Sequence, residues 1–200
     1  MLTRLKERVE LVLATEARLL HKMGLTPTQI SVLGILLALS AGLCIWASQF
    51  NRLFLLVASI AFMFSGVCDI LDGAVARLHN ESTIYGGFID SLLDRYAEAF
   101  VLVAIIVSGQ CDVLWGSIAL VGSLLVSYTR ARAEATGAKM ESIGVAERAE
   151  RVIILVVAIL ATLVWQEALS WSIVILAILA NATVLQRAVH FYKIAEPEKT

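Results

Sequence analysis

Charged residues are scarce in this sequence. Of its 200 residues only 16% are Asp, Glu, Lys or Arg, whereas 59% are hydrophobic, and the mean hydropathy is +0.82. A soluble globular domain typically has about 45–50% apolar and about 25% charged residues. The composition therefore excludes a disordered, a collagen-like and an ordinary soluble chain, and it indicates a protein that crosses the membrane several times. The net charge of −1 provides no positive field for nucleic acid, so we expect no nucleic-acid partner.

Cysteine and proline are also rare. The chain has only three cysteines (Cys44, Cys68 and Cys111), an odd number without CxxC spacing. This pattern supports neither a disulfide framework nor a zinc site, and we expect these side chains to act as small buried hydrophobes. We find no internal repeat, low-complexity tract or proline-rich linker that would divide the chain.

Basic and apolar residues are mixed in the N-terminal segment 1–25. Leu2, Leu5, Val9 and Val12 recur at helical spacing, and no uninterrupted apolar core follows the first charges, which is untypical of a signal peptide. We expect an amphipathic helix on the membrane surface, with a solvated helical tail as the alternative.

Six apolar segments follow, each close to the roughly 20 residues that a membrane-spanning helix needs. Thr26-Pro27 has the pattern of a helix start. The segments run over residues 28–48, 53–77, 88–109, 112–133, 149–166 and 170–194. We therefore predict an all-α integral membrane protein with six transmembrane helices in a single membrane domain, residues 26–195, preceded by the surface helix.

The distribution of Lys and Arg agrees with six spans. With this count Arg52 alone falls on the side opposite the two termini, which leaves the other 15 of the 16 basic residues on the side of the termini. Because basic loops stay in the cytoplasm, we expect both termini to be cytoplasmic. The four tryptophans fall near the outer ends of the segments, as in an aromatic belt.

Four carboxylates lie at the cytoplasmic ends of two consecutive segments. Asp69 and Asp72 end the second segment, and Asp90 and Asp94 begin the third. Spacings of three and four residues place each pair on one helix face, so the two pairs can face each other. Four close carboxylates repel strongly unless they are neutralised. Their all-oxygen ligands favour Mg²⁺, Mn²⁺ or Ca²⁺ over zinc.

Two alternatives concern neighbouring residues. Salt bridges to Arg77 and Arg95 could balance the acids, although two arginines cannot neutralise four carboxylates. Gly73, Gly86 and Gly87 either let a ligand approach the backbone closely or serve the packing of helices against one another.

The acidic motif resembles the signature of the CDP-alcohol phosphotransferases. The pattern Asp69-x2-Asp72-Gly73-x2-Ala76-Arg77-x8-Gly86-x3-Asp90-x3-Asp94 matches it at every fixed position. The resemblance implies that a small alcohol attacks the β-phosphoryl group of a CDP-lipid and that CMP leaves. It implies two Mg²⁺ or Mn²⁺ ions held by the four aspartates, with Asp94 also acting as general base. Such a mechanism suits phosphoryl transfer, which needs mainly positioning and charge stabilisation.

The resemblance also implies nucleotide contacts. They fall on the motif and on the start of the first span, namely Gly73, Arg77, Thr83, Thr28, Gln29, Ile30 and Ser31. Many family members have Asn or Asp where this chain has Thr28.

The run 127–134 and the run 147–151 look like those of family members that use inositol phosphate. The resemblance implies that Arg130, Arg132 and Arg187 hold the acceptor phosphate, and the family often has Lys in place of Arg130. On a regular helix Arg130 and Arg132 diverge by about 200°, so both reach one phosphate only if the helix ends there or one side chain reaches round. Arg187 lies in an apolar run, where either an anionic substrate or snorkelling to lipid headgroups would account for it.

Arg148 and Arg151 are open to two interpretations. They can pair with Glu147 and Glu150 or contact lipid phosphate, and we favour a structural role for both.

The sequence thus predicts a multi-pass enzyme of phospholipid biosynthesis with a cytoplasmic active site. Its predicted reaction transfers a phosphatidyl-type group, with ester or ether chains, from a CDP-lipid to inositol phosphate. Glycerol 3-phosphate and serine are alternative acceptors, and a cation transporter or a non-catalytic scaffold are alternatives of another class. The resemblance further implies a homodimer.

Overall fold

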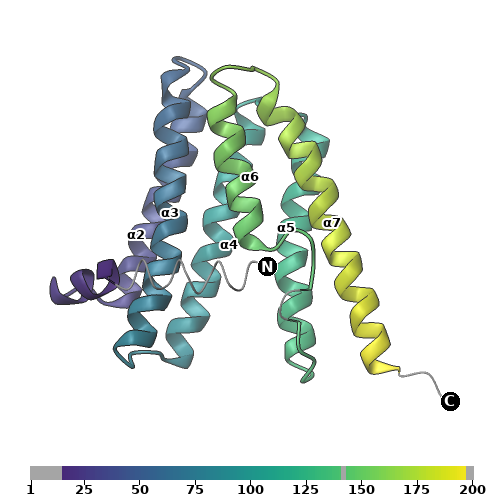
Figure 1. Cartoon of the computed structure of the whole chain (residues 1–200). Coiled ribbons are helices and arrows are strands. Elements are labelled where there is room, and N and C mark those ends of the chain that lie inside the picture. Colours follow the sequence, from purple (N-terminus) through teal and green to yellow (C-terminus); the bar gives the residue numbers. More distant parts are fainter. Residues whose placement is uncertain (1–14, 141–142, 197–200) are drawn as a thin grey trace.

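The chain folds into a bundle of long helices (Figure 1). The computed structural model describes residues 15–140 and 143–196, and this part contains helices and no strand. Residues 15–22 are helical. The long helices are α2 (Pro27–Ala47), α3 (Leu53–Leu78), α4 (Ile84–Val107), α5 (Val113–Glu134), α6 (Arg148–Ala161) and α7 (Ala168–Ala195). The prediction of an all-α protein is confirmed.

Local sequence signals define where several helices begin. Thr26 caps α2: its hydroxyl accepts from the Gln29 amide while the Gln29 side chain accepts from the Thr26 amide, which satisfies two otherwise unpaired N–H groups. Thr83 caps α4, accepting from the Gly86 amide at 2.9 Å. This cap explains why α4 begins four residues before the predicted start at residue 88.

Four of the helices are long and apolar enough to cross a membrane, namely α2, α3, α5 and α7. Helices α4 and α6 do not have the length and apolar composition of a span, for different reasons. The first 15 residues of α4 contain Asp90, Asp94, Arg95 and Glu98. Helix α6 has only 14 residues, about 21 Å at the rise of an α-helix, against a hydrocarbon core of about 30 Å. The four apolar helices indicate a membrane protein. The count of six spans remains a prediction.

The helices pack in two groups. Helix α2 packs against α3 and α4, α5 packs against α7, and α6 contacts both α3 and α7. A continuous apolar core joins all six and includes Ile45, Phe62, Leu102, Leu155 and Ile173. In Figure 1 the α2–α3 and α6–α7 connections lie at the top, whereas the α3–α4 connection and the end of α7 lie at the bottom.

Helical residues 15–22 lie against the lower end of α2 and α3 (Figure 1). Ala17 is fully buried in a small cluster with Ile30 and Val75. The rings of His21 and His79 stack with their centroids 3.5 Å apart. Most of the predicted amphipathic surface helix, residues 1–14, lies outside the described residues.

Candidate active site

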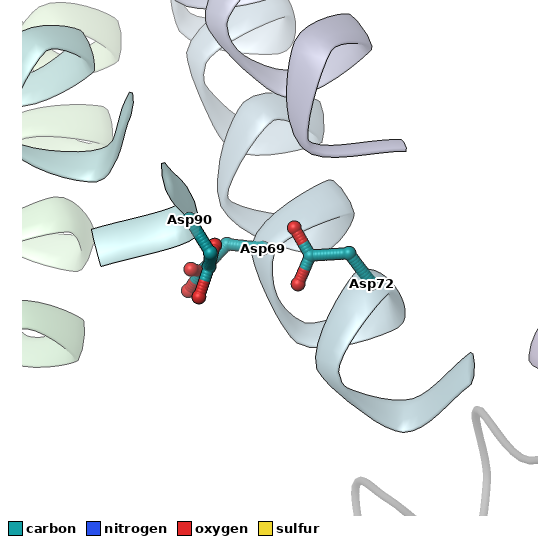
Figure 2. A group of neighbouring side chains, drawn as sticks. All are labelled: Asp69, Asp72 and Asp90. Carbon is teal, nitrogen blue, oxygen red and sulfur yellow. The ribbon is translucent and has the colours of Figure 1, made fainter. Parts of the chain in front are cut away.

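The aspartates of the motif converge where α3 and α4 face each other. Asp69, Asp72 and Asp90 each offer a carboxylate oxygen within 4.8 Å of the others. Figure 2 shows the two carboxylates of α3 directed towards that of Asp90 from α4. Asp94 lies outside this group of three, one helical turn after Asp90, but lines the same cavity as Asp69 and Asp72.

Helix α2 supplies a hydroxyl that orients one of these carboxylates. Ser31 Oγ donates to Asp72 Oδ2 at 2.6 Å, and both side chains are buried. A carboxylate fixed by such a bond keeps its other oxygen directed at the cluster, which is how partners behind a metal ligand commonly act.

An arginine from α6 completes the cluster. The guanidinium of Arg148 pairs with Asp69 and, at 2.8 Å, with Asp94. The favoured structural role expected Glu147 or Glu150 as the partner of this arginine, but its partners are Asp69 and Asp94. Sequence distance explains the miss, because 54 and 79 residues separate Arg148 from Asp94 and Asp69. Of the two arginines in the alternative prediction, Arg95 donates to the carbonyl of Ser91.

The donor set fits a divalent cation. The ligands are carboxylate oxygens only, which suits Mg²⁺ or Mn²⁺. One arginine cannot neutralise four acids. Within the described part of the chain, Asp90 Oδ1 is buried without a hydrogen-bond partner. A buried carboxylate oxygen left in this state is costly, and a bound cation would satisfy it.

The cavity beside the aspartates is narrow. Its volume is about 10 Å³, room for a single water molecule, and Arg148 and Ser31 form part of its wall. A cavity of this size is too small for the nucleotide of the predicted substrate.

The residues predicted to contact the nucleotide occupy different environments. Ser31 reaches the aspartates, Thr28 is exposed, and Gln29 serves the cap of α2. Ile30 is buried in the cluster beneath residues 15–22. Within the motif, a Cβ at Gly73 would come within 3.1 Å of Arg77 Nη1, so the absence of a side chain at Gly73 makes room for this guanidinium. Thr83 caps α4.

The three arginines predicted for the acceptor also differ in environment. Arg130 pairs with Glu134 one turn along α5 at 2.9 Å, and Arg132 is exposed. Arg187 is only 2% exposed. It donates to the carbonyls of Ile143 (2.8 Å) and Val126 and to Glu147 (3.3 Å). These protein partners, rather than a lipid headgroup, account for an arginine at this depth in an apolar helix.

Arg151 forms another ion pair, which is buried and which we did not predict from the sequence. Its partner is Glu98 of α4. The predicted structural role of Arg151 is confirmed in that it forms a salt bridge within the protein, but the partner is Glu98 and not Glu147 or Glu150. A signal was available, since Glu98 is an acid in an apolar stretch and requires a cation nearby.

The three cysteines are free thiols. Burial and the neighbouring Asp112 raise the pKa of Cys111, in the α4–α5 connection, to about 11. This thiol is therefore protonated at neutral pH and is a poor nucleophile.

A bundle of membrane helices with a carboxylate cluster between the ends of α3 and α4 is typical of a membrane protein that binds a divalent cation. The model of the CDP-alcohol phosphatidyltransferase family matches residues 24–184, which include the whole motif, and the chain belongs to this family. It is accordingly a transferase of phospholipid biosynthesis.

Individual relatives agree along most of the chain. The archaetidylinositol phosphate synthase of Pyrococcus horikoshii is 34% identical over 187 residues, 94% of each chain. The crystal structure of the phosphatidylinositol phosphate synthase of Mycobacterium tuberculosis with CDP-DAG bound has a TM-score of 0.78 at 28% identity, covering 90% of this chain and 92% of that one. The same synthase in complex with manganese and citrate also has a TM-score of 0.78 at 28% identity, covering 90% and 88% of the chains.

Proposed function

We propose that this enzyme transfers the phosphatidyl-type group of a CDP-lipid to inositol phosphate and releases CMP. The observation that carries the proposal is the convergence of Asp69, Asp72, Asp90 and Asp94 at the ends of α3 and α4. The similarity to synthases of both archaetidylinositol phosphate and phosphatidylinositol phosphate supports inositol phosphate as acceptor and leaves both ether and ester lipids as donors.

Asp69, Asp72, Asp90 and Asp94 would hold two Mg²⁺ or Mn²⁺ ions. When bound, these ions would supply charge neutralisation for the pyrophosphate and the departing phosphate. The manganese complex of the mycobacterial synthase supports such a site.

Asp94 is the proposed general base. It accepts the proton of the acceptor hydroxyl as the hydroxyl oxygen forms a bond to the β-phosphorus. The bond from that phosphorus to the bridging oxygen breaks, and its electron pair leaves with CMP. Asp94 suits this role because it lies at the edge of the group formed by the other three aspartates, on the side of Arg148.

The acceptor phosphate is proposed to bind between α5, α6 and α7. Arg187 has guanidinium N–H groups beyond the three used in its protein contacts, and its charge interacts with that of Arg130. A phosphate between them would relieve the repulsion between the two cations. Arg132 is exposed on the last turn of α5. Because the helix ends there, Arg130 and Arg132 could reach one phosphate despite their spacing of two residues. Arg148, once displaced from the aspartates, is a further cation for this phosphate.

Gly73, Arg77, Thr83 and the segment 28–31 are proposed to contact the CDP moiety. The position of Ser31 against Asp72 places the start of α2 at the edge of the cluster, which supports this assignment for the segment.

We further propose six membrane spans in a single domain, residues 26–195, with the N-terminal segment 1–25 on the membrane surface. Both termini and the active site lie on the cytoplasmic side, and the enzyme is a homodimer. The arrangement of the connections at opposite ends of the bundle supports an even number of crossings (Figure 1).

The first experiment is an acceptor comparison. Purified protein in detergent would be given CDP-lipid, Mg²⁺ and one acceptor at a time, and CMP release would be measured. We expect release with inositol 1-phosphate and not with inositol, glycerol 3-phosphate or serine. Release with glycerol 3-phosphate alone would preserve the aspartate mechanism and contradict the assignment of Arg130, Arg132 and Arg187.

Replacement of Asp94 by Asn tests the general base. The change removes the proton acceptor with little change in size, and we expect turnover to fall by at least about 10³-fold. The matched control is Asp112→Asn, which alters an aspartate that caps α5 away from the cluster. Wild-type CMP release by the Asp94→Asn protein, with an unchanged elution volume, would rule out this role.

A further inference from the structure

Glu98 and Arg151 form a forked ion pair outside the aspartate cluster. Arg151 Nε lies 2.6 Å from Glu98 Oε1 and Nη2 lies 2.8 Å from Oε2, and the two residues are only 1% and 4% exposed. A buried ion pair of this kind often stabilises a protein no better than apolar side chains of similar volume. Stability alone is therefore a weak explanation for it.

The Glu98–Arg151 pair lies one helical turn beyond the Asp94–Arg148 pair. Glu98 follows Asp94 by one helical turn in α4, and Arg151 follows Arg148 by three residues in α6. Helical neighbours at these spacings share a face. Two parallel ion pairs, Asp94–Arg148 and Glu98–Arg151, therefore connect the same faces of α4 and α6. The Glu98–Arg151 pair therefore links α4 and α6 one turn beyond the point where Arg148 meets the aspartates.

Arg151 also holds the segment that precedes α6. Its Nη1 donates to the carbonyl of Ala146 at 3.1 Å. The amide of Ala146 in turn donates to Thr183 Oγ1 at 3.0 Å, and the amide of Val145 donates to the side chain of Gln186 at 3.2 Å.

The same segment fixes Arg187, which bonds to the carbonyl of Ile143 and to Glu147. A continuous chain of contacts thus runs from Glu98 through Arg151 and residues 143–147 to Arg187.

We infer that Glu98 and Arg151 are positioning residues for the acceptor side of the reaction. They hold α6 and residues 143–147 so that Arg148 and Arg187 face the acceptor phosphate while Asp94 faces its hydroxyl. This inference rests on the proposed function, because it uses the proposed acceptor site. It assigns the pair no contact with CDP-lipid or with the metal ligands Asp69 and Asp72.

The decisive variant replaces the pair by an apolar one, Glu98→Leu with Arg151→Met. Because both charges are removed together, we expect a thermal midpoint close to that of the wild type. We expect the KM for inositol phosphate to rise about 10-fold or more, since a displacement on the order of 1 Å at a reacting group is costly, while the KM for CDP-lipid changes by less than about 2-fold. Arg151→Lys is the second variant: it keeps the charge but loses the fork, and it too should raise the acceptor KM.

Leu155→Ala is the matched control. Leu155 is fully buried one turn after Arg151 in α6, so its truncation lowers the thermal midpoint without touching the ion pair. We expect its acceptor KM to stay at the wild-type value. Hydrogen exchange of residues 143–150 adds a readout that needs no acceptor: it should accelerate in the apolar pair and in Arg151→Lys more than in Leu155→Ala.

A wild-type acceptor KM and unchanged exchange in either pair variant would overturn the inference. Failure of the proposed function would look different, because the wild-type enzyme itself would then release no CMP with inositol phosphate. In that case the exchange measurement still decides whether Glu98 and Arg151 hold the segment.

Discussion

At the scale of single residues, the site depends on side chains that orient the aspartates. Ser31 comes from α2, whereas Asp72, the aspartate to which it donates, lies on α3. Its hydroxyl also contacts the carbonyl of Pro27 at 3.2 Å, which keeps the side chain at the first turn of its helix. The bond to Asp72 therefore ties the position of α2 to the geometry of the carboxylate cluster.

Replacement of Ser31 by Ala should weaken divalent-metal binding. Loss of the hydroxyl leaves Asp72 free to rotate, and loss of such a partner typically costs about 10–100-fold in metal affinity. Titration with Mn²⁺, followed by electron paramagnetic resonance of the free ion, measures this directly. Ser40→Ala is the control, because Ser40 lies on the same helix and its hydroxyl donates to the carbonyl of Leu37. Equal Mn²⁺ affinity in Ser31→Ala and Ser40→Ala would show that Ser31 does not orient a ligand.

At the scale of elements, the segment before α6 needs a glycine. Gly144 has φ of +130°, a conformation that side chains rarely adopt, and a Cβ there would come 2.3 Å from Thr183 Cγ2. Two neighbouring amides of this segment bond to α7, so the segment cannot move away without breaking them. Gly144 thus allows residues 143–147 to lie directly on α7 beside Arg187.

Replacement of Gly144 by Ala should destabilise this contact. We expect a loss of about 1–3 kcal/mol from backbone strain, with a further loss from the clash, measured as a lower thermal midpoint. Gly137→Ala is the matched control, since Gly137 also has positive φ but open space around it. Thr183→Ser removes the clashing methyl and keeps the hydroxyl, so Gly144→Ala should cost less in that background. An equal cost in both backgrounds would contradict the packing explanation.

At the scale of the whole molecule, α4 and α6 are the two long helices that are not apolar and long enough for a span, and both carry charges that belong to the site or adjoin it. Helix α4 carries Asp90, Asp94 and Glu98, and α6 begins with Arg148 and Arg151. Each set would be expensive in lipid alone. Ion pairs between α4 and α6 neutralise these charges inside the bundle. We therefore expect both helices to cross the membrane although neither does so by length and composition.

Labelling of single cysteines tests these crossings. In protein without Cys44, Cys68 and Cys111, an impermeant maleimide applied to intact cells should label Asn51→Cys and Gln166→Cys but not Lys139→Cys. Three helices separate residue 51 from residue 139, so equal labelling of these two would mean that α4 does not cross. Equal labelling of residues 139 and 166 would mean the same for α6. Labelling of Lys139→Cys alone would reverse the proposed orientation.

Much of this protein was predictable because its strongest signals are local. The apolar segments give helices close to the observed ones, for example 53–77 against Leu53–Leu78, since membrane-length apolar runs have few alternatives to helix. The motif of four aspartates lies within 26 consecutive residues, and helical spacing brings its two halves together. The early end of α6 at Ala161 was not predicted, because apolar residues continue to Trp165.

The sequence by itself determined the class of protein, the helices and the aspartates, because composition, periodicity and short-range spacing act within a few turns of the chain. Only the tertiary structure decided which cations meet which acids. Arg148 pairs with Asp69 and Asp94, and Arg151 with Glu98, across helices that are remote in the sequence. A buried charge pairs with the opposite charge that packing brings within reach, and the sequence offered nearer partners to both arginines.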